Sequence, residues 1–192
     1  GGLGTRLAGI FDCPKCLVPV GGRPVLAHVL DHVRACGIAA ITLALAHRAS
    51  EVWAWVLQSW VLQGHTRESG AEVGCTVETS PTGISNAVKL AIRHSTAKSI
   101  VVVNGDTILD YDLRDAIKAL LGRGIVAICN QDTRQHTGVV AIDRLRSSEL
   151  SISLEDLVGS AYPIVTHAPF IDVGTPEGLA QARRVFEGWR YR

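Results

Sequence analysis

The first residues of the chain, GGLGTRL, combine three glycines with one arginine, a composition that suits the binding of an anion. Glycine lets backbone N–H groups come close to phosphate oxygens, and Arg6 adds a forked cationic donor. The stretch is not a Walker A loop, because GK[ST] is missing, and it does not match GxGxxG. An ordinary glycine turn is the alternative, and this stretch alone does not decide between the two.

Cysteine and histidine pairs raise the question of a zinc or redox site. Cys13 and Cys16 fit CxxC, but no second pair completes a zinc site. His28 and His32 have the spacing of some metal ligands, yet the apolar stripe of their helix lies on its other face, so we expect both to be solvated. One expected helix carries three tryptophans, Trp53, Trp55 and Trp60. They indicate a buried or interface-facing helix rather than a platform on which bases stack.

Length and composition restrict the class of protein. The chain has 192 residues, of which 47% are hydrophobic and 19% charged, so we expect one globular domain over residues 1–192. There are 19 Lys and Arg against 18 Asp and Glu, which argues against nucleic-acid or membrane partners. No apolar run is long enough to span a bilayer. Five cysteines, an odd number, fit a reducing cytoplasm.

Helical and strand-like patterns alternate along the chain, which predicts an α/β fold with a mostly parallel sheet covered on both faces. Ligands bind such sheets at the carboxyl ends of strands, where GGLGTRL would lie. The expected helices are 24–36, 50–63 with Ser50 as N-cap, 85–94, 111–121, 154–160 and 176–187, and the expected strands are 38–46, 72–79, 99–103, 125–129, 139–142 and 164–173.

Several motifs follow one another at fixed intervals, and together they carry a resemblance. GGLGTRL is followed by Pro14-Lys15 and by PVGGRP, which leads into a helix, and later come SPTGISNA, NGD, GVV and FIDVGTPE. In this order and spacing the chain resembles the sugar-1-phosphate nucleotidyltransferases from Gly1 to about Arg184. Within that family it is most similar to the branch that guanylylates manno-heptose 1-phosphate.

The resemblance implies a Rossmann-like three-layer α/β/α fold and a set of site residues. Arg6, Lys15 and Asp106 would be catalytic, with the two cations facing the nucleotide phosphates. Asp106 and Asp172, at two strand ends, would hold Mg²⁺, an ion that prefers oxygen ligands. The nucleotide would be bound by Gly1, Gly2, Leu3, Gly4, Thr5, Arg6, Glu78, Pro81 and Gly83, and the sugar by Gly138.

The implied reaction joins a nucleoside triphosphate to a sugar 1-phosphate of the manno-heptose or mannose type and releases pyrophosphate. Guanine is the favoured base, because Glu78 replaces a glutamine that is frequent in thymidylyl and uridylyl relatives, and a carboxylate can accept from guanine N1–H and the 2-amino group. A uridylyl- or thymidylyl-transferring relative and a non-catalytic nucleotide- or sugar-phosphate-sensing domain are the alternatives. Cytidylyl and molybdopterin-guanylyl transferases usually carry SxRMG instead of GTRL. The sequence allows a homo-oligomer but does not determine the oligomeric state.

Two departures from the family pattern concern missing parts. The family has a strand immediately before the glycine loop, and it has a Glu-Lys pair that holds the sugar phosphate, whereas no lysine follows Lys118 here. The chain also contains no methionine. We therefore expect a strand upstream of Gly1 and a break in the bonded chain, with residues missing, between Asp143 and Ser153.

Overall fold

The computed structural model describes residues 11–62, 72–79, 84–93, 95–144, 158–159 and 161–186. Its strands are β1 (Pro19–Val20), β2 (Arg23–Pro24), β3 (Ala40–Leu45), β4 (Glu72–Val77), β5 (Ser99–Val103), β6 (Thr107–Leu109), β7 (Ile125–Asn130), β8 (His136–Asp143), β9 (Tyr162–Thr166) and β10 (Phe170–Asp172). Its helices are η2 (Lys15–Leu17), α1 (Val25–Ala35), α2 (Ala49–Trp55), η3 (Val56–Val61), α4 (Ile84–Arg93), α5 (Leu113–Ala119) and α7 (Pro176–Phe186).

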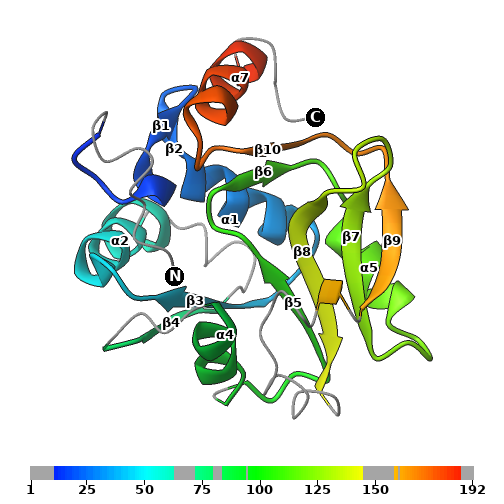
Figure 1. Ribbon diagram of the computed structural model, residues 1–192. Helices are drawn as coiled ribbons and strands as arrows, with labels where there is room; N and C mark the ends of the chain where they lie inside the picture. Colours follow the sequence, from blue (N-terminus) through cyan, green and yellow to red (C-terminus); the bar gives the residue numbers. More distant parts are fainter. Residues whose placement is uncertain are drawn as a thin grey trace.

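Four strands form the largest described sheet, in the order β5-β8-β7-β9. β8 runs antiparallel to both of its neighbours and β9 runs parallel to β7, so β5, β7 and β9 share one direction. β3 and β4 form a separate parallel pair, and β6 pairs with β10 in antiparallel fashion (Figure 1). The α/β class and the predominance of one strand direction agree with the sequence-based expectation.

Helices cover both faces of this sheet because the side chains of β8 alternate between two cores. Val139 and Ala141 pack in one core with residues of α1 and α5. Val140 and Ile142 pack in the other core with residues of α4. This alternation is the period of two that a strand imposes, and it produces the three-layer arrangement.

The expected strand 164–173 is two strands in different sheets, so that expectation was wrong. β9 ends at Thr166, whose hydroxyl accepts a hydrogen bond of 2.9 Å from the N–H of Ala168. Pro169 follows and has no N–H to donate to a ladder. The chain therefore leaves the edge of β7 and continues as β10 beside β6.

The helix expected over 50–63 begins one residue earlier and changes its winding. α2 starts at Ala49 after Arg48, which has a left-handed φ of 52°, so Ser50 lies inside the first turn and is not the N-cap. From Val56 the helix continues as the π-helix η3. Trp60 within it is buried and donates to Asp31 at 3.2 Å, which confirms a packing role for this tryptophan.

The expectation that His28 and His32 face solvent was also wrong. His28 is 3% exposed, lies 2.9 Å from the carbonyl of Val20, and packs against the ring of Phe186 at a tilted angle. His32 is half-buried and lies 2.8 Å from the carbonyl of Tyr111. Val20 of β1 and Phe186 of α7 cover His28 on the polar face of α1. The apolar periodicity of α1 could not predict this, because the covering residues come from distant segments of the chain.

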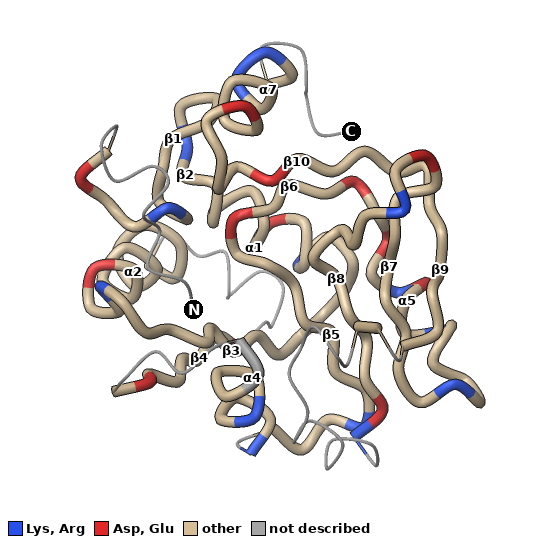
Figure 2. Tube along the Cα trace, viewed as in Figure 1, with Lys and Arg blue, Asp and Glu red and all other residues tan. Residues whose placement is uncertain are grey.

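Other expectations fall outside the described residues. These are the glycine loop within residues 1–10, the turn at 80–83, most of the helix expected over 154–160, and the break expected between Asp143 and Ser153. Among the residues that are described, no helix is long and apolar enough to cross a membrane. Charged residues of both signs are distributed over the elements rather than gathered on one of them (Figure 2).

Candidate functional site

Lys15 and Asp106 meet at the carboxyl end of β5. Lys15 begins η2, directly after Pro14, and Asp106 lies in the turn that joins β5 to β6. The Nζ atom of Lys15 forms an ion pair with Oδ2 of Asp106. Asp106 is 7% exposed, whereas the side chain of Lys15 is 35% exposed, so the carboxylate is buried while the ammonium group still reaches solvent.

Asp172 lies beside Asp106 because β6 and β10 pair with each other. Asp172 is opposite Thr107 in the register, and the N–H of Val173 donates to the carbonyl of Asp106 at 2.9 Å. A β-carbon on Gly174 would lie 2.9 Å from Oδ1 of Asp172 and 3.0 Å from Oδ2 of Asp106. The two carboxylates therefore approach the same point.

The position of Asp172 also depends on α7. Gly178 in the first turn of this helix approaches β10 so closely that a β-carbon there would overlap the carbonyl of Asp172. The side chain of Asp172 accepts a hydrogen bond of 2.8 Å from the N–H of Gly174. The close approach of α7 thus positions the backbone of Asp172, and the N–H of Gly174 orients its carboxylate.

These two carboxylates fit a hard divalent cation. Mg²⁺ is usually bound by one or two carboxylates, while substrate phosphates and waters complete its coordination. Among the described residues there is no cluster of three or more His, Cys, Asp or Glu side chains that could enclose a metal on their own. The donor set therefore fits an ion shared with an anionic substrate better than an ion enclosed by protein.

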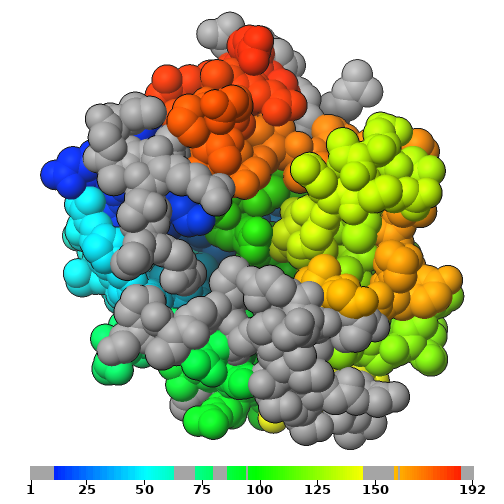
Figure 3. All heavy atoms as spheres, in the orientation of Figure 1, coloured from blue at the N-terminus to red at the C-terminus, as the bar shows by residue number. Residues whose placement is uncertain are grey.

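A small cavity of about 300 Å³ opens next to Asp172. Neutral polar residues dominate its lining, which consists of Asn104, Thr107, Gln135, His136, Thr137, Gly138, Phe170 and Asp172. In the space-filling view, a hollow with a green floor lies between the orange of the C-terminal segments and the yellow-green of β8 (Figure 3). The neutral polar side chains of this lining can hydrogen-bond hydroxyl groups, and Asp172 supplies its carboxylate.

Gly138 lies on the wall of this cavity in a conformation that favours glycine. Its φ is +83°, and a β-carbon would lie 2.7 Å from Nδ2 of Asn104. The carbonyl of Gly138 accepts a hydrogen bond of 3.0 Å from the N–H of Asn104. The predicted sugar-contacting residue is therefore beside the metal-binding candidates, with Asn104 between them.

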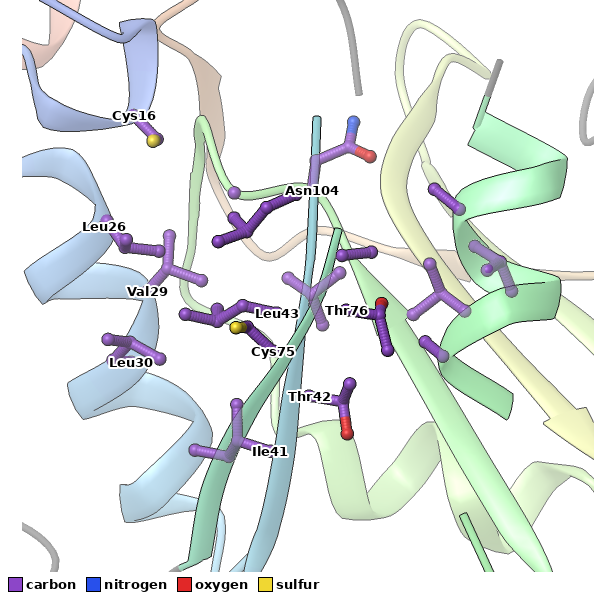
Figure 4. Close-up of a pocket in the computed structure, with 18 of the residues that line it drawn as sticks. Cys16, Leu26, Val29, Leu30, Ile41, Thr42, Leu43, Cys75, Thr76 and Asn104 are labelled. Carbon is purple, nitrogen blue, oxygen red and sulfur yellow. The ribbon is translucent and has the colours of Figure 1, made fainter. Parts of the chain in front are cut away.

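A second, larger cavity of about 1420 Å³ lies between β3 and β5. Leu26, Val29 and Leu30 of α1 point into it from one side, and Ile41 and Leu43 come from β3 (Figure 4). Lys15, Asn104 and Asp106 line it as well, so it reaches the carboxyl ends of the strands. Among the described residues, only Asn104 and Asp172 line both cavities.

Glu78 directly follows β4, and its N–H donates to the carbonyl of Leu45 at 2.9 Å. This places the half-buried Glu78 at the carboxyl end of the β3–β4 pair. The remaining predicted nucleotide-binding residues, Gly1, Gly2, Leu3, Gly4, Thr5, Arg6, Pro81 and Gly83, lie outside the described residues.

Sequence reasoning missed Arg48, Asn104 and His136. Arg48 forms ion pairs with Asp12 and Glu51 next to the segment that carries Lys15. Asn104 belongs to the NGD motif, so its place at a strand end was a usable signal. His136 lines the small cavity, but no sequence pattern predicted this position, because it depends on a register shift between β7 and β8.

The CxxC pair shows no feature of a reactive thiol. Both cysteines are free. Burial raises the pKa of Cys16 to about 11, and the negative charge of Asp106 adds to this effect. Burial also raises the pKa of Cys13. Nucleophilic and metal-binding cysteines need the thiolate form, which these environments disfavour.

Comparison with known proteins identifies the family. The profile of the MobA-like NTP transferase domain matches residues 1–165, so the chain belongs to this family. The resemblance to sugar-1-phosphate nucleotidyltransferases is thereby confirmed, and enzymes of this family generally use a divalent metal.

Individual relatives carry more specific names. The chain is 32% identical over 149 residues to mannose-1-phosphate guanyltransferase of Saccharomyces cerevisiae, which covers 74% of this chain and 40% of that protein. It is 26% identical over 159 residues to D-glycero-alpha-D-manno-heptose 1-phosphate guanylyltransferase of Campylobacter jejuni, with 82% and 66% covered. The chain thus spans about 40% of the length of the mannose-specific relatives that it matches.

The fold is shared with solved structures. The crystal structure of HddC from Yersinia pseudotuberculosis superposes with a TM-score of 0.80 at 23% identity, covering 97% of this chain and 96% of that one. HddC complexed with GMP-PN gives a TM-score of 0.78 at 25% identity, covering 97% and 96%. These superpositions confirm the α/β fold.

Proposed function

We propose that the protein transfers a guanylyl group from GTP to the phosphate of a sugar 1-phosphate of the mannose or manno-heptose type. The convergence of Asp106 and Asp172 beside Lys15, with the Gly138 cavity adjoining, carries the proposal. The names of the relatives point to the same reaction. An oxygen of the sugar phosphate would form a bond to the α-phosphorus, the bond between the α-phosphorus and the bridging oxygen would break, and pyrophosphate would leave.

Charge neutralisation and positioning are the main requirements of this reaction. A phosphate monoester has a second pKa near ~6, so the attacking group is already mostly dianionic at neutral pH and needs no general base. The obstacle is repulsion between two anions, which oriented cations remove. We assign this role to Lys15, whose Nζ already lies at Asp106, and to Arg6 in the glycine loop.

Asp106 and Asp172 would hold the divalent metal, which we propose to be Mg²⁺. When bound, the ion would neutralise phosphate oxygens and orient the reacting groups. Because Lys15 pairs with Asp106, the lysine and the ion would share one carboxylate. The triphosphate offers Lys15 a second anionic partner, so the lysine can turn toward the phosphates without losing all ion pairing.

We assign the sugar 1-phosphate and the nucleoside triphosphate to different parts of the site. Gly138 and Asn104 would contact the sugar in the small cavity. Gly1, Gly2, Leu3, Gly4 and Thr5 would cradle the phosphates, while Glu78, Pro81 and Gly83 would surround the base. Glu78 would accept from guanine N1–H and the 2-amino group. We also propose a cytoplasmic location, on the odd number of cysteines in the sequence alone.

Pyrophosphate release tests the proposal directly. The protein is incubated with Mg²⁺, mannose 1-phosphate or manno-heptose 1-phosphate, and in turn GTP, UTP, ATP, CTP and dTTP. We expect release with GTP, and Glu78→Gln should reduce the preference for GTP. A clear preference for UTP or dTTP would remove the guanine assignment. Calorimetric binding of GTP without release, across a panel of sugar phosphates, would favour a nucleotide-sensing domain instead.

A further inference from the structure

β8 contains a β-bulge at the wall of the small cavity. Ala127 of β7 pairs with Val140 of β8, and Cys129 pairs with His136. Ile128 is therefore opposite the three residues Thr137 to Val139. Bulges of this kind bend a strand and change the direction in which its backbone groups point, and they are frequent next to active sites.

The ring of His136 spans this bulge. Its Nδ1 accepts a hydrogen bond of 3.1 Å from the N–H of Gly138, and its Nε2 lies 3.0 Å from the carbonyl oxygen of Val139. Since a backbone N–H can only donate and a carbonyl can only accept, the ring must be the neutral tautomer with hydrogen on Nε2. Burial lowers the pKa of His136, which agrees with the neutral form.

Two further contacts hold the rest of the bulge. The hydroxyl of Thr137 donates to the carbonyl of Ile128 at 2.9 Å, and the N–H of Asn104 donates to the carbonyl of Gly138 at 3.0 Å. Thr137 is 1% exposed, so its position is determined by packing. His136 binds the N–H of Gly138 and the carbonyl of Val139 in the same bulge.

We propose that His136 is a positioning residue for the sugar phosphate: its ring braces the bulge and thereby fixes the Gly138 wall of the acceptor cavity. This inference rests on the proposed function. Without the brace, the left-handed turn at Gly138 would lose two hydrogen bonds and could relax, so that the wall would shift relative to Asn104 and Asp172. Small shifts in substrate position reduce rates strongly because the reacting atoms must be aligned.

Four variants test the role. His136→Phe keeps an aromatic ring but offers no hydrogen bond, and His136→Ala removes the ring. His136→Gln presents an oxygen that can accept and an N–H that can donate, so it should restore part of the bracing. His167→Ala is the matched control, because His167 is exposed and lines neither cavity.

Steady-state kinetics with GTP and mannose 1-phosphate should separate positioning from general stability. We expect His136→Phe and His136→Ala to lower kcat/KM for mannose 1-phosphate roughly tenfold, with the KM for GTP unchanged. His136→Gln should recover most of the difference, and His167→Ala should match the parent protein. Equal kcat/KM values for mannose 1-phosphate in all four variants would overturn the proposal, even if thermal stability fell.

Hydrogen exchange separates this proposal from the proposed function. The amide of Gly138 should exchange faster in His136→Phe than in the parent, while amides of Ala141 and Ile142 in the same strand stay protected. Unchanged exchange at Gly138 would overturn the bracing role whether or not the protein turns over substrate. Absence of pyrophosphate release in the parent protein would contradict only the proposed function, because the exchange measurement needs no substrate.

Discussion

β5 and β8 are neighbours in one sheet, yet their side chains are buried to different degrees. Val139, Val140, Ala141 and Ile142 of β8 are at most 1% exposed. Ile100 to Val103 of β5, which pair with them residue by residue, are only half-buried. Both strands are apolar and rich in β-branched residues, so composition does not explain the difference.

The difference arises from the edges of the two strands. β8 has β5 on one side and β7 on the other. Among the described strands β5 has only β8, and its other edge faces the cavity of about 1420 Å³ that it shares with β3. A sheet buries its side chains well only where neighbouring strands extend the surface on which helices pack. Among the described residues, the β8 side is therefore the more tightly packed part of the fold, and a cavity separates β3 from β5.

Asp106 lies where these two sides meet, and its substitution should have the largest effect. Asp106→Asn is expected to lower turnover by at least about 100-fold, because an amide cannot neutralise the metal or pair with Lys15. The fold should persist, since Asn has nearly the same shape. The measurement is pyrophosphate release with Mg²⁺, together with thermal unfolding.

Asp115→Asn is the control for this variant. Asp115 lies on the surface of α5 and pairs with Lys118, away from both cavities. Near-normal magnesium-dependent activity of Asp106→Asn would remove both its catalytic and its metal-binding assignment.

A matched pair of valines compares the two sides directly. Val140 of β8 and Val102 of β5 are register partners, but Val140 is 1% exposed and Val102 is half-buried. Val140→Ala should cost roughly 2 kcal/mol of unfolding free energy, and Val102→Ala less than half of that, because a partly exposed side chain loses less on truncation. Urea unfolding measures both values. Equal costs would show that the cavity is filled in solution.

His28 provides the smallest expected effect, a pH dependence of stability. Burial lowers the pKa of His28 in the folded protein below its ordinary value of 6.5. The unfolded chain therefore binds a proton more readily as the pH falls through about 6.5, so the free energy of unfolding decreases toward lower pH. His28→Gln, which can still donate to Val20, should flatten this part of the profile. An unchanged slope would assign the pH dependence to other groups.

Part of the site could be predicted because local sequence carries it. Asp106 follows an apolar strand in a glycine turn, and Lys15 follows a proline in a fixed motif. The sequence therefore predicted that both residues belong to the site. The pairing of Asp106 with Asp172 in space was suggested only by the resemblance. β6 and β10 are three residues each, too short for a period of two to be recognised, and their pairing joins segments far apart in the chain.

The sequence by itself determined the order of the longer helices and strands, since apolar periodicity and glycine or proline at the ends are local properties, but it did not predict β1, β2 and β6 or the separation of β9 from β10. The strand 99–103 was predicted with its observed bounds, and the strand near 125–129 missed one residue. Only the tertiary structure decided the burial of His28, the bulge that His136 spans and the unequal packing of β5 and β8. Each of these depends on which distant segment lies alongside, and the free energy of such contacts is not encoded in any one segment.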